Sequence, residues 1–259
     1  MNLFKSEFRK LIYSRTTYGL LLAAIGLASL TSGVLPYVFS KQLNPMGTSA
    51  LTQQAVVDTV YGKAAGAYLF AIILGVILMA GEFRQGTAVA TFLAAPKRGH
   101  VFLAKVAIAA IAGAGLQLIA SGIAMVVAHT ALGFYPEAVA PSDTAYLDTV
   151  LAAVISGAVL AVVGVAVGTL IRNQMLGTLV AILWLNLIEP IMILVFPDGA
   201  KWWATGAISG ILNLHVSVGR NGVTTADYLE PWQASLLLLG YGAVISLISF
   251  ATTLRRDVD

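Results

Sequence analysis

The chain has 259 residues, of which 58% are hydrophobic and only 10% are charged. Soluble globular domains average about 45–50% apolar and about 25% charged residues, so this composition excludes an ordinary soluble domain and indicates an integral membrane protein. The formal net charge is only +3, and the absence of cysteine excludes disulfide bonds and thiolate metal sites.

The first predicted element is an amphipathic helix within residues 1–15. The basic side chains of Lys5, Arg9 and Lys10 lie opposite an apolar face with helical spacing. A basic amphipathic helix of this kind lies in the membrane interface, with its charges toward anionic headgroups. Two roles remain open: an anchor for the N-terminus, or a sharp turn that rocks with the first span. The apolar positions are Phe4, Phe8, Leu11 and Ile12.

Six apolar runs follow this helix. A helix needs about 20 residues to cross a hydrocarbon core of about 30 Å, and the runs fit that length. We therefore predict an all-α membrane protein with a single transmembrane domain, residues 1–259. The second run is short, so its helix would have to extend to Gly62 or Gly81. The third is long enough to tilt or to extend past the bilayer. The predicted spans are 17–38, 64–80, 106–133, 150–171, 175–196 and 233–254.

The distribution of Lys and Arg predicts the orientation. Of the 15 basic residues, the four on one side are Lys41, Lys63, Lys201 and Arg220, and the other side carries the remaining eleven. Positively charged loops stay in the cytoplasm. We therefore expect both termini and the polar segment 82–100 to be cytoplasmic.

The polar segment between the second and third spans has the features of a short helix. Thr87 is a suitable N-cap for a helix over 88–95, and Pro96 ends it. Val89, Phe92 and Leu93 give that helix one apolar face. This apolar face must be buried against something. The candidates are the headgroup layer, the protein's own spans and a soluble protein.

A family resemblance rests on these residues. The pattern Glu82-Phe83-Arg84, Gly86-Thr87, Leu93, Pro96, Arg98 and Lys105 resembles the membrane subunit of a type-2 ATP-binding-cassette (ABC) transporter, the export permease family. The run Trp184–Pro190, followed by Pro197 and Trp202-Trp203, is similar to a pattern in small bacterial permeases of this kind. A basic amphipathic helix before six spans fits the same family.

The resemblance implies that the segment 82–100 contains a coupling helix, which docks in a cleft of a separate ATPase subunit. Phe92 and Leu93 would be its packing anchors, and Arg84 and Arg98 would lie at the rim. The alternative is that these charges only set the topology. The implied ATPase-coupling residues are Glu82, Arg84, Gly86, Thr87, Val89, Phe92, Leu93, Pro96 and Arg98.

Glu189 is the one acidic residue inside an apolar run, the fifth. Ionisable side chains in the bilayer core cost about 2.5–3.5 kcal/mol on insertion scales, so they face protein or water. With Asn186 and Pro190, this carboxylate would line a transport path or outer gate. The alternative is a buried hydrogen bond to Asn186, to a neighbouring span or to the outer segment 197–232, where we expect short re-entrant helices.

Smaller polar and glycine pairs point to helix packing. Gln117 and Ser121 share one face of the third span, where polar side chains can join helices. Gly164 and Gly168 form a small-xxx-small pair that permits close contact between helices.

The sequence predicts a transporter subunit and not an enzyme. It has no phosphate-binding loop of the form G-x-x-x-x-G-K-[ST], and its three His residues are isolated. We expect ATP and Mg²⁺ to bind the partner ATPase, with no cofactor, metal or nucleic acid on this chain. The expected partners are that ATPase, membrane lipid and a second permease copy or paralogue.

The leading interpretation is a permease in a bacterial plasma membrane that exports hydrophobic or amphipathic cargo, such as a drug, a natural product or a lipid-linked molecule. Two alternatives remain: an ion- or proton-coupled carrier with Glu189 as the relay, and a non-transporting immunity or scaffold protein.

Overall fold

The computed structural model describes residues 3–42, 48–84, 86, 98–212, 214, 216–219, 222–225 and 228–252. Within these residues, six helical runs are long and apolar enough to cross a membrane, as the sequence predicts. The helices are α1 (Leu3–Ile12), α2 (Arg15–Ser40), α3 (Gln54–Gly62), α4 (Tyr68–Arg84), α6 (Arg98–Leu132), α7 (Ala145–Leu170), α8 (Gln174–Leu183), α9 (Glu189–Val195), α10 (Ala204–Ile211) and α11 (Pro231–Thr252). Two short strands, β1 (Val216–Gly219) and β2 (Gly222–Thr225), pair in the segment before α11.

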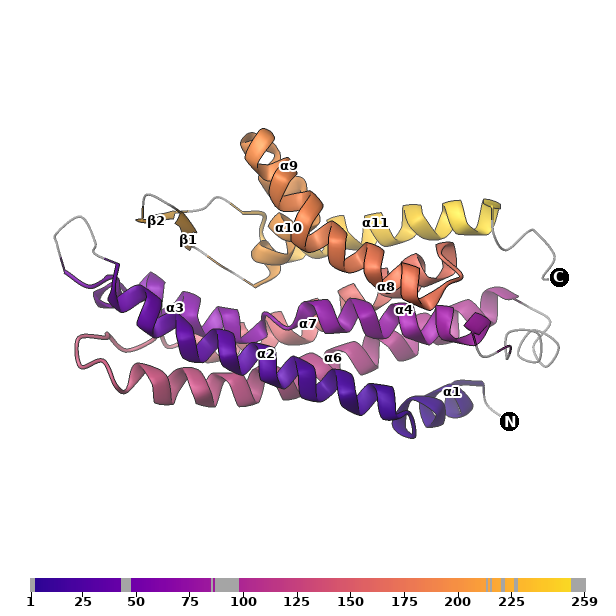
Figure 1. Ribbon diagram of the computed structural model, residues 1–259, viewed down its shortest axis with the longest axis horizontal. Helices are drawn as coiled ribbons and strands as arrows, with labels where there is room; N and C mark the ends of the chain where they lie inside the picture. Colours follow the sequence, from indigo (N-terminus) through magenta and orange to yellow (C-terminus); the bar gives the residue numbers. More distant parts are fainter. Residues whose placement is uncertain are drawn as a thin grey trace.

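The long helices form an elongated bundle. Figure 1 shows α2, α4, α6, α7 and α11 running along the long axis, while α8 lies oblique to it and α9 projects away from the bundle. The short helix α1 and the last turns of α11 lie at one end of this bundle, and the β1–β2 hairpin lies toward the other. We call the end that carries α1 the α1 end.

Helix α7 is the centre of the bundle and packs against α4, α6 and α11. Lipid tails are as apolar as leucine, so helices in a bilayer associate through close packing of small residues. Gly113 on α6 and Gly157 on α7 meet in this way: a Cβ atom on Gly113 would lie 2.2 Å from the Gly157 carbonyl oxygen. The two backbones therefore touch, and a larger residue does not fit at either position.

Helix α7 approaches α4 just as closely. A Cβ atom on Gly164 would lie 2.1 Å from the Ile72 carbonyl oxygen, and one on Gly75 would lie 2.0 Å from the Ala161 carbonyl oxygen. Gly168, one turn further along, faces Val76. The Gly164–Gly168 pair thus makes the close helix contact that its spacing predicts.

The second span is longer than predicted and is interrupted. The sequence prediction of 64–80 is contained in a run from Gln54 to Glu82, which is broken by a 3₁₀ turn at Lys63–Ala65. Lys63, which the charge count grouped with the non-cytoplasmic residues, lies at this 3₁₀ turn, and its side of the membrane stays a prediction.

Gln117 satisfies the backbone at this interruption. Its side-chain amide is fully buried on α6 and donates a 2.6 Å hydrogen bond to the Ala65 carbonyl oxygen. A 3₁₀ turn leaves carbonyl groups without their α-helical partners, and an unpaired carbonyl in an apolar interior is costly. Gln117 therefore joins α6 to the break in the second span, as its position in an apolar run predicts.

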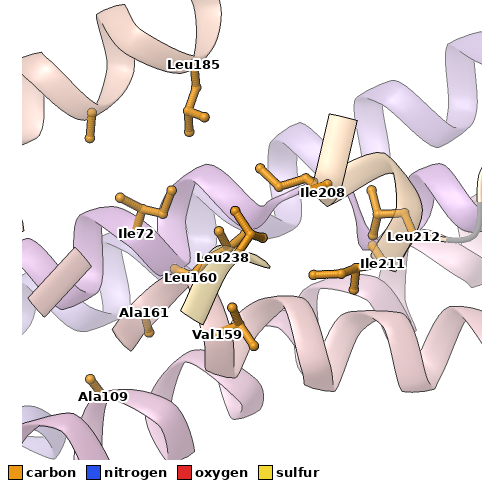
Figure 2. Packing of buried hydrophobic residues seen from close by; sticks show 14 of the residues in the cluster. Ile72, Ala109, Val159, Leu160, Ala161, Leu185, Ile208, Ile211, Leu212 and Leu238 are labelled. Atoms are coloured by element: carbon orange, nitrogen blue, oxygen red, sulfur yellow. The ribbon is translucent and has the colours of Figure 1, made fainter. Parts of the chain in front are cut away.

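The short helix α10, between the fifth and sixth candidate spans, contributes to the core. Ile208 and Ile211 of α10 are almost fully buried and pack with Leu160 of α7 and Leu238 of α11. Figure 2 shows these side chains converging from three helices. The segment where we expect short re-entrant helices contains α10, which is short and buried within the bundle, and its re-entry from the membrane surface stays a prediction.

The strand pair is an addition to the predicted all-α fold. β1 and β2 are antiparallel, with Gly219 opposite Gly222. The sequence carries a signal for this hairpin in its β-branched residues, which are Val216 and Val218 before the turn and Val223, Thr224 and Thr225 after it. That signal is short and is easily overlooked beside the six apolar runs.

The glycine contacts predict a sharp difference between two positions on α6. Gly113→Ala places a methyl group against the α7 backbone, so it should destabilise the protein by about 1–3 kcal/mol or more. Gly115→Ala is the matched control, because nothing lies within 4 Å of its Cβ position. Alanine favours helix, so this control should be neutral or more stable by up to about 1 kcal/mol. Thermal melting of the purified variants measures both, and equal stability of the two would contradict the packing described.

Candidate functional site

A buried ion cluster at the α1 end joins three helices. Glu82, near the end of α4, lies 2.9 Å from the ammonium of Lys105 on α6 and 3.0 Å from that of Lys10 on α1. Lys105 is only 1% exposed, and its ammonium also donates a 3.3 Å hydrogen bond to the Leu78 carbonyl oxygen. We call Lys10, Glu82 and Lys105 the ion cluster.

The two pairs of this cluster differ in strength. Removing one partner of a buried ion pair leaves an uncompensated charge and costs about 3–5 kcal/mol, which is the situation of Glu82 and Lys105. The side chain of Lys10 is half exposed, and exposed pairs contribute about 0–1 kcal/mol. The Glu82–Lys105 pair, which joins α4 to α6, is therefore the stronger of the two.

The ion cluster lies on the two helices that precede and follow, along the chain, the segment predicted to bind an ATPase. Helix α4 enters that segment and α6 leaves it, so Glu82 and Lys105 join the two helices that flank it. Sequence reasoning placed Glu82 among the ATPase-contacting residues, yet its carboxylate is 8% exposed and faces the protein. Lys105 was part of the family pattern, but its pairing across helices was missed, because residues 23 positions apart carry no periodic signal.

The structure describes three other predicted coupling residues. Arg84 is exposed and donates a 3.3 Å hydrogen bond to the Gln174 side chain at the start of α8. Gly86 has a φ of 66°, a conformation that glycine adopts at little cost. Arg98 is the first residue of α6. Thr87, Val89, Phe92, Leu93 and Pro96 lie outside the described residues.

The predicted amphipathic helix corresponds to α1. Leu11 is buried, whereas Phe8 and Ile12 are each 41% exposed, and Phe4 is within the helix. Exposed apolar side chains beside basic residues are typical of a helix that lies in a membrane interface. That location remains a prediction.

A second buried carboxylate lies near the outer segment. Glu189 is 1% exposed, and one of its oxygens accepts a 2.5 Å hydrogen bond from the Trp184 indole. Its other oxygen accepts a 2.6 Å bond from the Thr205 backbone N–H and a further bond from the Thr205 hydroxyl. Both oxygens are thus engaged, and no contact with Asn186 is involved, since the Asn186 amide donates to the Ile182 carbonyl oxygen.

Glu189 acts as an N-terminal cap for α10. Thr205 is in the first turn of α10, where backbone N–H groups have no partner within the helix. The residue that precedes this helix, Trp203, makes no side-chain capping bond. A carboxylate at a helix N-terminus is stabilised by the helix dipole, so Glu189 holds α10 against the fifth span.

A π-helical turn places Trp184 beside this carboxylate. The residues Trp184–Ile188 form the turn, and the Glu189 backbone N–H donates to the Trp184 carbonyl oxygen. Such i→i+5 turns occur as single bulges within α-helices, frequently at functional sites. Pro190 follows and lies at the start of α9, where its missing N–H is tolerated.

His129, which is isolated in the sequence, lies beside two tyrosines in the structure. The Tyr61 hydroxyl lies 3.1 Å from the His129 Nδ1 atom and 3.4 Å from the Tyr146 hydroxyl. The two tyrosine rings meet edge to face at 5.0 Å. These contacts join α3, α6 and α7, so we assign them a structural role.

No protein-family model matches this chain, and no curated protein matches it. The proposed function therefore rests on the residues of this chain and on the contacts between them.

The Glu189 contacts predict a specific loss of stability. In Glu189→Gln, the amide NH₂ group would face donors instead of accepting from them, leaving buried N–H groups unpaired at about 1–3 kcal/mol. Asn186→Ala is the matched control, because that amide is exposed and bonds within its own helix. Thermal melting should show a lowered midpoint for Glu189→Gln only. If Glu189→Gln melts like the control, the capping role is wrong, and unchanged transport by that variant would remove Glu189 from the transport path.

Proposed function

We propose that this chain is the membrane subunit of an ATP-driven exporter and works with a separate ATPase subunit. The observation that carries the proposal is the ion cluster, which joins the flanking helices of the predicted coupling segment to α1. A force applied to that segment from the water side would reach α4, α6 and α1 together. This is the mechanical arrangement that a permease driven by a separate ATPase requires.

The packing of α7 supports transmission along the bundle. Helices α4 and α6 both contact α7 through touching backbones, and packed backbones transmit displacement because they are not compressible. Displacement at the α1 end therefore reaches the far end of the bundle. Between the two ends, α10 packs against α7 and α11 and is attached to the fifth span through Glu189 and Thr205.

The proposed cargo is hydrophobic or amphipathic and leaves a bacterial cell through its plasma membrane. Few charged side chains lie within the candidate spans, so a strongly polar cargo would find few partners there. We propose a second copy or paralogue of the permease as the other half of the transport path, on the basis of the family resemblance.

The engagement of both Glu189 oxygens with α10 and Trp184 does not favour a proton relay at that residue.

The proposal predicts which residues bind the ATPase. Replacing Phe92 and Leu93 together with alanine should abolish co-purification with a co-expressed ATPase subunit, because those side chains would be the anchors of the interface. The matched control replaces Leu22 and Leu30, which are exposed on α2, and should co-purify normally. Both variants should insert into the membrane, which their yield after extraction measures. Retention of the ATPase by the Phe92/Leu93 variant would contradict the assignment.

A further inference from the structure

Lys63 is a cation inside a candidate membrane span. It lies in the run Gln54–Glu82, at the 3₁₀ turn between α3 and α4, and its side chain is partly buried. Among the residues that the structure describes, its ammonium has no hydrogen-bond partner and no acidic partner. Ionisable side chains within membrane spans are costly unless they face a partner or water, and they mark substrate or ion pathways. Lys63 is therefore a candidate binding residue.

The turn that carries Lys63 lies level with the middle of the third candidate span. Gln117 is the central residue of the 31-residue span Phe102–Leu132, and its amide donates a hydrogen bond to the Ala65 carbonyl oxygen. Spans that are interrupted near the bilayer centre form the substrate sites of many transporters. Lipid headgroups lie about 15 Å from that centre, which is half of the hydrocarbon core, so the headgroup of a surrounding lipid does not reach this level. The position thus favours a bound solute over a structural lipid.

Lys63 lies between two packed surfaces. On one side of it, a Cβ atom on Gly62 would lie 3.0 Å from the Leu214 side chain and 3.2 Å from the Leu212 carbonyl oxygen, both just after α10. On the other side, Ala64 is fully buried in a cluster with residues of α2 and α6. The side chain of Lys63 therefore leaves the turn between these two surfaces.

A partly open apolar face continues from Lys63 along the span. Gly66 is three residues further along and Phe70 is four residues beyond that, and both are partly buried. Spacings of three and four residues place these positions on one helix face. A glycine followed by an aromatic ring offers apolar surface and no charge. A ligand held by the ammonium would therefore place a hydrophobic part along this face, as an amphipathic molecule does.

We propose that Lys63 binds the anionic group of the cargo, which makes the cargo an amphipathic anion. The ammonium donates charge-assisted hydrogen bonds to one carboxylate, sulfonate or phosphate group, and Gly66 and Phe70 contact the apolar part. This inference rests on the proposed function, because it assigns the face of Lys63 to the transport path. It narrows the hydrophobic or amphipathic cargo of that proposal to molecules that carry an acidic group.

The test measures the binding of two fluorescent probes to the full chain in phosphatidylcholine nanodiscs, with the signal of empty nanodiscs subtracted. Anilinonaphthalenesulfonate carries one sulfonate group, and phenylnaphthylamine has the same ring system without it. The unmodified chain should bind the sulfonate probe more tightly, because only that probe can pair with the ammonium of Lys63.

Three variants assign this difference to one residue. Lys63→Gln removes the ammonium and should weaken binding of the sulfonate probe about tenfold, with no change for the neutral probe. Lys63→Arg keeps the charge and should restore binding of the sulfonate probe. Lys41→Gln is the matched control, because that ammonium is exposed just after α2, where it contacts the Tyr37 ring, and it should leave the binding of both probes unchanged. Thermal melting of each variant confirms that it is folded.

The proposal is supported if Lys63→Gln alone removes the preference for the sulfonate probe. It is overturned if that variant binds the sulfonate probe like the unmodified chain, or if the unmodified chain binds both probes equally. It is also overturned if inorganic phosphate displaces the sulfonate probe as effectively as dodecanoate, because the site would then take a free inorganic anion. The measurement needs no ATPase, so a negative result overturns the Lys63 site and leaves the co-purification test of the exporter unaffected.

Discussion

The close backbone contact between α7 and its neighbours α4 and α6 is the constraint on which the rest of this structure depends. Water does not drive apolar helices together inside a bilayer, so the bundle requires surfaces that fit without side chains between them. Gly157 and Gly164 provide those surfaces on α7, facing Gly113 and Gly75. With α4 and α6 held in this way, the ends of both helices lie close enough for Glu82 and Lys105 to pair across 2.9 Å.

Two buried carboxylates then connect peripheral segments to that centre. Glu82 holds α1 and α6 through ammonium groups, and Glu189 holds α10 through backbone and hydroxyl donors. Each would be costly in an apolar environment if it were alone. Because each is paired, the charge becomes a link between helices, one near the α1 end and one at the outer segment. The proposed exporter uses both links: the first receives the movement of the ATPase, and the second holds the segment that would close the outer path.

The sequence predicted what depends on local composition. Six apolar runs gave the candidate spans, and the glycine spacing in α7 gave its packing face. The prediction began the second span too late, because a lysine at position 63 is typical of a loop. The helical run continues past Lys63, and the buried Gln117 amide donates a hydrogen bond to the Ala65 carbonyl oxygen at the nearby break. The pairing of Glu82 with two lysines and the role of Glu189 as a cap for α10 could not be predicted, since both join residues that only the tertiary fold brings together.

The central claim is that α1, α4 and α6 move together when an ATPase partner binds nucleotide. Since the chain has no cysteine, spin labels can be placed at Arg9→Cys on α1 and Leu247→Cys on α11, both exposed, and at Leu103→Cys on α6 as an internal reference. Pulsed electron paramagnetic resonance of the chain reconstituted with the proposed ATPase subunit should show a changed 9–247 distance with ATP and vanadate, and an unchanged 9–103 distance. A 9–247 distance that stays the same under trapped nucleotide would contradict the account.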